Sequence, residues 1–299
     1  MLDLCCFGFI SALRVMSVLR YPTANSGTIS TDMFGVLTPD APIVAALVSH
    51  FGLEVGLITN GIGDEARGRR LRTVLQQAKI VTDINVSADN ITPQTIVISD
   101  SQNNRTWFSY LPNVLGDLMS VNLALLPNSR LAYVDAYSII QPASFRAIEF
   151  ANRNNTPLFV NLGGDPLSDN LTELLRKGRI AIIKTSIDDV SRQSPERYVR
   201  SIRDALQAKV TVVTLGKHGA ICATLSDTFF VPAFELPVIH NHGAGAAFCA
   251  GLAFAYLNDW NIQKSVRFAS ASGGLYCTVK DGIGKFSSQD VLDVMNSNA

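Results

Sequence analysis

Short apolar runs alternate along the chain with stretches whose apolar residues recur at helical spacing. The runs Leu4–Ile10, Leu131–Val134 and Pro157–Val160 have the length and content of buried strands. Residues 143–152, between the last two runs, have the spacing of a helix. Strands and helices that alternate in this way are typical of right-handed βαβ units. We therefore expect an α/β fold with a mainly parallel sheet that helices cover on both faces.

Two further segments mix polar and apolar residues instead. Residues 14–34 combine Tyr, Thr, Ser and Gly with scattered apolar positions, which favours strands of a half-exposed sheet. Thr95–Ser99 and Thr106–Tyr110 flank a turn-rich segment and predict a β-hairpin. Three roles are open to Trp107 and Tyr110 in this hairpin: stacking on a substrate ring, lining a dimer contact, or packing within a small sheet.

The composition is that of a folded protein with a large core. The chain has 299 residues, of which 47% are hydrophobic, and we expect one domain over residues 1–299. Lys and Arg together number 25, as do Asp and Glu. This balance gives no indication of a basic face for nucleic acid and favours a small-molecule partner.

The apolar residues near the start of the chain predict a strand and not a signal peptide. Asp3 precedes the apolar run, no Lys or Arg does, and Arg14 interrupts it. We expect no membrane span, because no segment has the roughly 18 uninterrupted apolar residues that a span requires. The five cysteines are odd in number and lack Cys-x-x-Cys spacing, which favours reduced core thiols in a cytoplasmic protein.

A glycine-rich stretch, Gly243–Gly251, has the pattern of a loop that opens into a helix. Gly243 and Gly245 allow the backbone to turn so that its N–H groups point at a common centre, where the positive end of the following helix adds its field. Gly243, Ala244 and Gly245 would then form an anion hole. The alternative is a turn of small residues that lets the helix pack closely against a strand.

Three stretches resemble the PfkB (ribokinase-like) family of carbohydrate kinases: Val55–Gly68, Val212–Ala220 and Gly243–Gly251. The resemblance covers nearly the whole chain in the order of its elements. It implies the three-layer ribokinase-like α/β fold, with a small β lid contributed by about residues 14–35 and 93–112. It also implies ATP and Mg²⁺ as ligands, a small-molecule substrate, a cytoplasmic location and a homodimer formed through the lid.

The resemblance also assigns roles to residues scattered along the chain. Asp189 stands where a family Glu helps to place Mg²⁺ through water, and its carboxylate is a ligand that Mg²⁺ accepts. An ordinary helix start with acidic first-turn residues is the alternative for this segment. The substrate-binding positions correspond to Leu13, Asp40, Asn60 and Asn113. The nucleotide-binding positions correspond to Lys184, Ser186, Thr214, Gly216, Gly219 and Ser270.

Several family features are altered in this chain. The general base, an Asp at the end of the Gly-Ala-Gly run, is replaced by Ala246. Leu13 stands in place of a sugar-binding Asp and cannot accept a hydrogen bond. Three motifs also change. The family's Gly-Gly turn is replaced by Thr38-Pro39-Asp40, and its strand end Asp-x-Asn-x-Arg is replaced by Asn161-Leu162-Gly163-Gly164. The family's Asn-x-x-Glu motif is replaced by Ser186-Ile187-Asp188-Asp189.

The missing base leads to three hypotheses about function. A positioned general base contributes roughly 10² to 10⁴ in rate, so we expect impaired phosphoryl transfer from ATP to a hydroxyl while phosphate binding remains. Alternatively, His242 replaces the base in an active, divergent carbohydrate kinase. His240 and His242 would then point to one side of an extended segment, with His242 beside the anion hole. The third hypothesis is a pseudokinase that acts through a partner protein.

Overall fold

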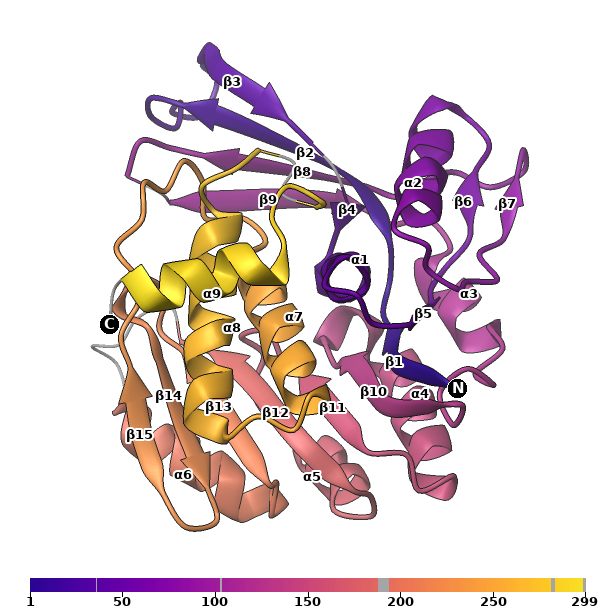
Figure 1. Cartoon of the computed structure of the whole chain (residues 1–299). Coiled ribbons are helices and arrows are strands. Elements are labelled where there is room, and N and C mark those ends of the chain that lie inside the picture. The colour runs from indigo at the N-terminus through magenta and orange to yellow at the C-terminus, as the bar shows by residue number, and fades with distance from the viewer. Residues whose placement is uncertain (36, 103, 188–193, 281–282, 298–299) are drawn as a thin grey trace.

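The computed structural model describes residues 1–35, 37–102, 104–187, 194–280 and 283–297. Within these residues the main sheet has eight strands in the order β15-β14-β13-β12-β11-β10-β1-β5 (Figure 1). Strand β14 is antiparallel to both of its neighbours, β13 and β15. The other neighbouring strands of this sheet are parallel. The predicted α/β fold with a mainly parallel sheet is confirmed. The strands are β1 (Leu2–Phe7), β5 (Val55–Ile58), β10 (Ser129–Asp135), β11 (Leu158–Asn161), β12 (Ile180–Ser186), β13 (Val210–Thr214), β14 (Ala220–Thr224) and β15 (Thr228–Val231).

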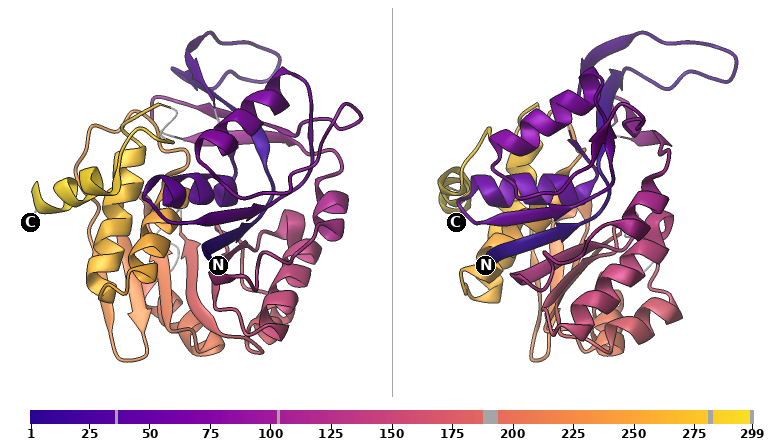
Figure 2. Two further views of the ribbon diagram at one scale, coloured as in Figure 1. Left: turned by 45° about the vertical axis from the view of Figure 1, so that its right-hand side comes forward. Right: turned by 90° about the vertical axis from the view of Figure 1, so that its right-hand side faces the viewer.

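Side chains of the parallel strands alternate between two apolar cores, one on each face of the sheet. Along β1, Leu4 and Cys6 belong to one core, whereas Cys5 and Phe7 belong to the other. Burial on both faces explains why these strands are continuous apolar runs. Helices α1, α7, α8 and α9 cover the first face, and α3, α4, α5 and α6 cover the second (Figure 1 and Figure 2). Their bounds are α1 (Asp40–His50), α3 (Val114–Ser120), α4 (Gln141–Arg153), α5 (Asp169–Leu175), α6 (Pro195–Leu206), α7 (Ala244–Leu257), α8 (Ile262–Tyr276) and α9 (Ser288–Ser297).

A second, smaller sheet stands at the carboxyl end of β1, because β2 begins shortly after β1 ends. Its strands follow the order β3-β2-β8-β9, with β4 paired to β2. We call these strands the upper sheet, since they lie above the main sheet in Figure 1. They come from the two segments in which the sequence predicts half-exposed strands and a hairpin. The upper sheet comprises β2 (Ser11–Val18), β3 (Ser30–Phe34), β4 (Leu37–Thr38), β8 (Gln94–Ser99) and β9 (Arg105–Tyr110), while β6 (Ile62–Gly63) and β7 (Val86–Ser87) form a separate pair beside α2 (Ala66–Gln77).

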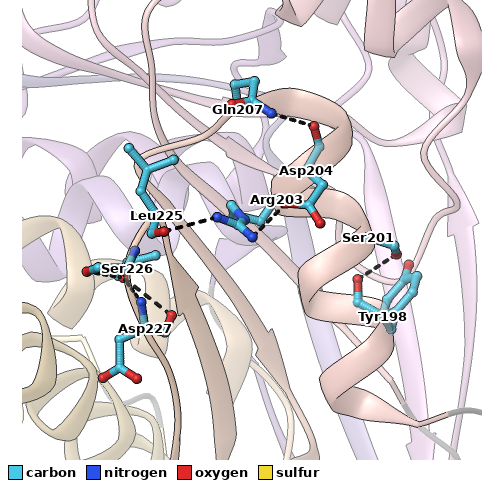
Figure 3. A network of polar contacts seen from close by, with 9 residues as sticks. Tyr198, Ser201, Arg203, Asp204, Gln207, Leu225, Ser226 and Asp227 are labelled. Carbon is cyan, nitrogen blue, oxygen red and sulfur yellow. Dashed lines mark hydrogen bonds and ion pairs between the residues drawn. The ribbon is translucent and has the colours of Figure 1, made fainter.

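The turn between β14 and β15 ties the edge of the main sheet to α6 (Figure 3). The Arg203 guanidinium donates to the Leu225 carbonyl over 3.4 Å and lies 2.6 Å from the Asp204 carboxylate. Gln207, at the end of α6, donates to the Asp204 carbonyl over 2.9 Å. The Arg203–Leu225 bond joins α6 to the β14–β15 turn, while the contacts to Asp204 lie within the end of α6.

All five cysteines are buried and unpaired, in agreement with the prediction of free core thiols. Burial raises the pKa of the Cys5, Cys222, Cys249 and Cys277 thiols to about 12. They therefore act as small apolar side chains in the two cores. The described part of the chain contains no helix long and apolar enough to cross a membrane.

Candidate functional site

Helix α7 begins at a glycine whose conformation and surroundings both exclude a side chain. Gly243 has a φ of +79° and directly precedes α7. A Cβ at this position would lie 2.6 Å from the Tyr276 ring. The first turn of a helix leaves its N–H groups without partners inside the helix, and the helix dipole makes this end positive. The start of α7 is therefore compatible with the predicted anion hole at Gly243, Ala244 and Gly245.

Lys184, near the carboxyl end of β12, faces the start of α7. Its side chain is 3% exposed, and its Nζ lies 3.3 Å from the point that a Cβ would occupy on Gly245. The Lys184 carbonyl accepts from the Leu162 N–H at 2.8 Å, but its ammonium makes no hydrogen bond or ion pair within the described residues. A buried cation at the positive end of a helix is unfavourable unless an anion joins the two. We call Lys184, Gly243, Ala244 and Gly245 the cradle.

Three polar side chains stand side by side at the carboxyl ends of adjacent strands. Asp135 of β10 pairs in register with Asn161 of β11, which pairs with Lys184 of β12. Ligands bind most often at this end of an open α/β sheet. Because side chains alternate along a strand, the three residues face α1 and α7, as do the residues two positions before them. Those earlier residues belong to the core under α1 and α7: Tyr133, Phe159 and Ile182.

Asp135 is fully buried, and both of its carboxylate oxygens are bonded within the fold. Its Oδ2 accepts from the Ala41 N–H at 2.8 Å, which fixes the start of α1 beside β10. Its Oδ1 accepts from the Tyr133 hydroxyl at 2.9 Å and from the Asn161 amide at 3.1 Å. Burial, followed by the nearby charge of Asp40, raises the pKa of Asp135 to about 7. Asp135 is thus a structural carboxylate that carries a proton for part of the time near neutral pH.

Asp40, the first residue of α1, lies beside Asp135 and is half-buried. Its Oδ2 accepts from the Asn161 amide at 2.9 Å, and the Tyr137 hydroxyl is also bonded to it. The Asn161 nitrogen also lies 2.8 Å from each of the Tyr133 and Tyr137 hydroxyl oxygens. Burial and the charges of the two aspartates raise the pKa of both tyrosines well above the usual value. The phenols therefore stay protonated and can donate to the carboxylates.

The two histidines before the cradle have different surroundings. His240 is buried, its Nε2 lies 2.9 Å from the Val279 carbonyl oxygen, and its ring packs on Phe34. Burial, followed by the charge of Arg105, lowers the pKa of His242 to about 4. At pH 7 the His242 imidazole is neutral, and with so low a pKa it is a weak proton acceptor.

The upper sheet contacts the segments on either side of helices α7 and α8. Arg105 of β9 donates to the Asn241 carbonyl over 3.4 Å, immediately before the cradle. Asp32 of β3 lies 2.5 Å from the Lys280 ammonium, which follows α8. The upper sheet therefore lies against the approach to the cradle, and the role of a lid remains a prediction.

Two of the nucleotide-binding positions given by the resemblance lie in register on β12 and β13. Ser186 pairs with Thr214, whose hydroxyl donates to the Thr185 carbonyl over 3.3 Å. The Ser186 hydroxyl donates to the Gly163 carbonyl in a short bond. Both hydroxyls are thus bonded to backbone carbonyls, that of Thr214 to β12 and that of Ser186 to the segment after β11. Asp189, the predicted Mg²⁺ position, lies outside the described residues.

Two further nucleotide-binding positions, Gly219 and Ser270, lie beside residues 231–232. Gly216 and Gly219, in the turn after β13, both have positive φ values, of +56° and +109°. A Cβ on Gly219 would lie 2.8 Å from the carbonyl carbon of Pro232. Ser270 of α8 donates to the Pro232 carbonyl over 3.4 Å. Gly219 and Ser270 thus both adjoin the same short segment.

Of the four predicted substrate-binding positions, Asp40 alone lies beside the row of polar strand ends. Leu13 packs with Val97 in an apolar cluster of the upper sheet. Asn60 is fully buried, where its Oδ1 accepts from the Ile10 N–H at 2.8 Å. Asn113 is exposed and precedes α3 with a φ of +60°. Contact of Leu13, Asn60 and Asn113 with a substrate stays a prediction.

Sequence reasoning missed three members of the site: Asp135, Tyr133 and Tyr137. The run Leu131–Val134 predicts a plain core strand, although Asp135 directly follows it. An acidic residue at the carboxyl end of a buried strand is the signal that could have pointed to the site. Its partner Asp40 lies far away in sequence, and the polar ends of neighbouring strands meet only in the folded sheet.

The fold places a helix start opposite the carboxyl ends of parallel strands, an arrangement in which α/β proteins commonly bind anionic ligands. Comparison with known sequences makes the class more specific. The family described as pfkB family carbohydrate kinase matches residues 44–288. The chain belongs to the PfkB family of carbohydrate kinases, and it is similar to sugar and nucleoside kinases of that family.

Two relatives match most of the chain. The aminoimidazole riboside kinase of Salmonella typhimurium is 27% identical over 276 residues, which cover 85% of this chain and 86% of that protein. The nucleoside kinase of Methanothermobacter thermautotrophicus is 25% identical over 276 residues, which cover 90% and 87% of the two chains.

Solved structures share the ribokinase-like fold over the whole chain. The nucleoside kinase of Methanocaldococcus jannaschii has a TM-score of 0.82 at 17% identity and covers 99% of each chain. A putative ribokinase II from E. coli in complex with ATP and Mg²⁺ has a TM-score of 0.81 at 16% identity, and covers 99% of this chain and all of that one. At these identities the likeness establishes the fold.

Proposed function

We propose that this chain binds the phosphates of a nucleoside triphosphate, ATP by family resemblance, in the cradle. The observation that carries the proposal is Lys184, a buried cation without a hydrogen-bonding partner in the described residues, which faces the positive start of α7. Each of these two positive features destabilises the other, and a bound phosphate relieves both. Thr214, Gly216, Gly219 and Ser270 would lie toward the nucleoside.

Position 246 contributes no proton acceptor in this proposal. Ala246 is fully buried in the first turn of α7, and its methyl group cannot take up a proton. Phosphoryl transfer by the usual arrangement of the family is therefore impaired. His242, the alternative acceptor, is disfavoured because its lowered pKa, about 4, makes it a weak base at neutral pH.

The residues present also fit the ligands that the family implies. ATP supplies the phosphoryl group, and Mg²⁺ neutralises charge on its phosphate oxygens. Mg²⁺ is usually held by one or two carboxylates together with phosphates and waters, and Asp189, outside the described residues, is the carboxylate that the resemblance offers for it. Lys184 and the first N–H groups of α7 would hold the terminal phosphates and keep them oriented toward the polar row. A pseudokinase would bind ATP–Mg²⁺ in the same way but would not transfer its phosphoryl group.

Replacement of Lys184 by methionine is expected to weaken the binding of ATP–Mg²⁺ by about 10- to 100-fold. One charge-assisted hydrogen bond contributes about 1.5–3 kcal/mol, and about 1.4 kcal/mol corresponds to a tenfold change in Kd. Isothermal titration calorimetry measures the change. Lys209→Met is the matched control, since Lys209 is exposed and precedes β13 at the opposite end of the sheet. Equal affinities for the two variants, or no heat from the wild type at millimolar ATP–Mg²⁺, would contradict the proposal.

A further inference from the structure

We propose that Asp40 is a catalytic residue that accepts the proton of the substrate hydroxyl, in place of the carboxylate that position 246 lacks. The inference rests on the proposed function, because it requires a phosphoryl donor held in the cradle. It adds to that function a working proton acceptor and so favours an active kinase. Its evidence is the position of Asp40 relative to the cradle, its accessibility and its hydrogen-bonding partners.

Asp40 lies close to the cradle. Asn161 and Lys184 are in-register neighbours on β11 and β12, and adjacent strands lie about 4.8 Å apart. Asp40 Oδ2 is 2.9 Å from the Asn161 amide nitrogen, while Lys184 Nζ faces Gly245. The Asp40 carboxylate is therefore about one strand spacing and one hydrogen bond from the lysine of the cradle.

Asp40 is also close to the N-terminal part of α7. The charge of Asp40 acts on His242, which precedes the cradle, and on Cys249, one turn into α7. Ala246 lies between these two residues on the chain. The helix that Asp40 begins packs against α7, so the Asp40 carboxylate is near the N-terminal part of α7, which contains position 246.

Asp40 and Asp135 differ in their accessibility. Asp135 has no exposed surface, and its two oxygens accept bonds from Ala41, Tyr133 and Asn161. Asp40 is half-buried and begins α1, where a negative charge is favoured. Asp40 can therefore meet a substrate, whereas Asp135 cannot.

The neighbours of Asp40 suit a proton acceptor that must hold its orientation. Asn161 and Tyr137 bond to the Asp40 carboxylate and act as positioning residues. Because the pKa of Asp135 is raised to about 7, Asp135 can hold a proton near neutral pH. The titratable groups around the pair are Cys6, Tyr133, Tyr137, Lys184, His242 and Cys249.

In the step that Asp40 assists, a lone pair of the substrate hydroxyl oxygen forms a bond to the terminal phosphorus of the nucleoside triphosphate. The bond from that phosphorus to the bridging oxygen breaks, and its electron pair leaves with the nucleoside diphosphate. The hydroxyl proton passes to the Asp40 carboxylate and from there to water. The products are a phosphate monoester, a nucleoside diphosphate and one proton.

The test compares wild type, Asp40→Asn, Ala246→Asp and the double variant in an ADP-release assay with ATP–Mg²⁺ and a panel of polyols and nucleosides. Asp40→Asn is expected to lower kcat by about 10²- to 10⁴-fold and to leave the Kd for ATP–Mg²⁺ within about threefold. The double variant is expected to have a kcat at least about tenfold above that of Asp40→Asn, because Ala246→Asp again places a carboxylate near the reacting oxygen. Asp64→Asn, an exposed Asp just before α2, is the matched control and keeps the wild-type rate.

A second measurement does not depend on turnover. In protein labelled with ¹³C at the aspartate carboxyls, Asp40→Asn is expected to lower the apparent pKa of Asp135, since a neighbouring negative charge is removed. An unchanged Asp135 titration would contradict the pairing on which the inference depends.

Other outcomes separate this inference from the proposed function. If Asp40→Asn turns over within threefold of the wild type, Asp40 is not the acceptor. If the wild type binds ATP–Mg²⁺ but turns over no compound of the panel, the inference is wrong while the proposed function stands. If the wild type binds no ATP–Mg²⁺, the proposed function fails, and the inference fails with it.

Discussion

Asp135→Asn is expected to change how stability depends on pH by up to about 4 kcal/mol between pH 4 and pH 7. In the unfolded chain an Asp loses its proton near pH 3.9, whereas the folded protein holds the Asp135 proton up to about pH 7. Between these values the folded state binds more protons than the unfolded state. The contribution of Asp135 to the free energy of unfolding is therefore largest below pH 4 and falls by up to about 1.4 kcal/mol per pH unit until pH 7.

His242 acts in the opposite direction over part of this range. Its pKa is lowered from 6.5 to about 4, so between these values the unfolded chain takes up a proton that the folded protein does not. The His242 contribution is present above pH 6.5 and is lost as the pH falls toward 4. In the wild type the Asp135 and His242 contributions to the free energy of unfolding change in opposite directions with pH. In Asp135→Asn the stability that His242 loses as the pH falls is no longer offset by Asp135.

Urea unfolding of wild type and Asp135→Asn at several pH values from 4 to 7 measures this effect. The variant is expected to be less stable than the wild type at every pH, because an amide cannot accept all three bonds of the carboxylate. The difference in the free energy of unfolding should narrow as the pH rises. A difference that stays constant across the range would show that Asp135 is ionised throughout. His242→Gln is the companion variant, with the opposite change expected between pH 4 and 6.5.

Gly68→Ala is expected to lower the free energy of unfolding by about 3 kcal/mol through overpacking. Gly68 lies in the first turn of α2, where a Cβ would be 2.8 Å from the Thr92 hydroxyl and closer still to the Gly63 carbonyl. The Thr92 hydroxyl already accepts from the Gly63 N–H at 3.0 Å. Neither neighbour can move without disturbing the other, so the helix itself must shift.

Gly116→Ala is the matched control, since Gly116 also lies inside a helix, α3. No heavy atom lies within 4 Å of a Cβ built there. Alanine is the better helix former by up to about 1 kcal/mol, so this variant should be as stable as the wild type or more so. Denaturant unfolding of both variants gives the comparison. Equal effects at the two positions would mean that helix propensity, and not packing against residue 63, decides the result.

The fold could be predicted because the signals for it are local. Continuous apolar runs indicate strands buried on both faces, and the helix predicted over 143–152 corresponds to α4, Gln141–Arg153. The start of α7 could also be predicted, because Gly243 reports a backbone conformation that other residues rarely adopt. Such features depend on a residue and its close neighbours in the chain.

The contacts of the candidate site could not be predicted, because they depend on register and on packing across elements. Asp40 and Asp135 meet because the Ala41 N–H, next to Asp40, donates to Asp135, and because Asn161, in register with Asp135, donates to both carboxylates. The surroundings of the two histidines differ because His240 packs against Phe34 of the upper sheet. No local spacing encodes either contact.

The burial of all five thiols gives a way to follow local opening of this molecule. Cysteines react with alkylating reagents as thiolates, and thiol pKa values near 12 leave almost none of the ionised form at neutral pH. Alkylation must then wait for the surrounding element to unfold, so its rate reports the free energy of that opening. Cys5 and Cys6 on β1, Cys222 on β14, Cys249 on α7 and Cys277 after α8 are therefore built-in probes of four separate regions, readable by mass spectrometry without any engineered label.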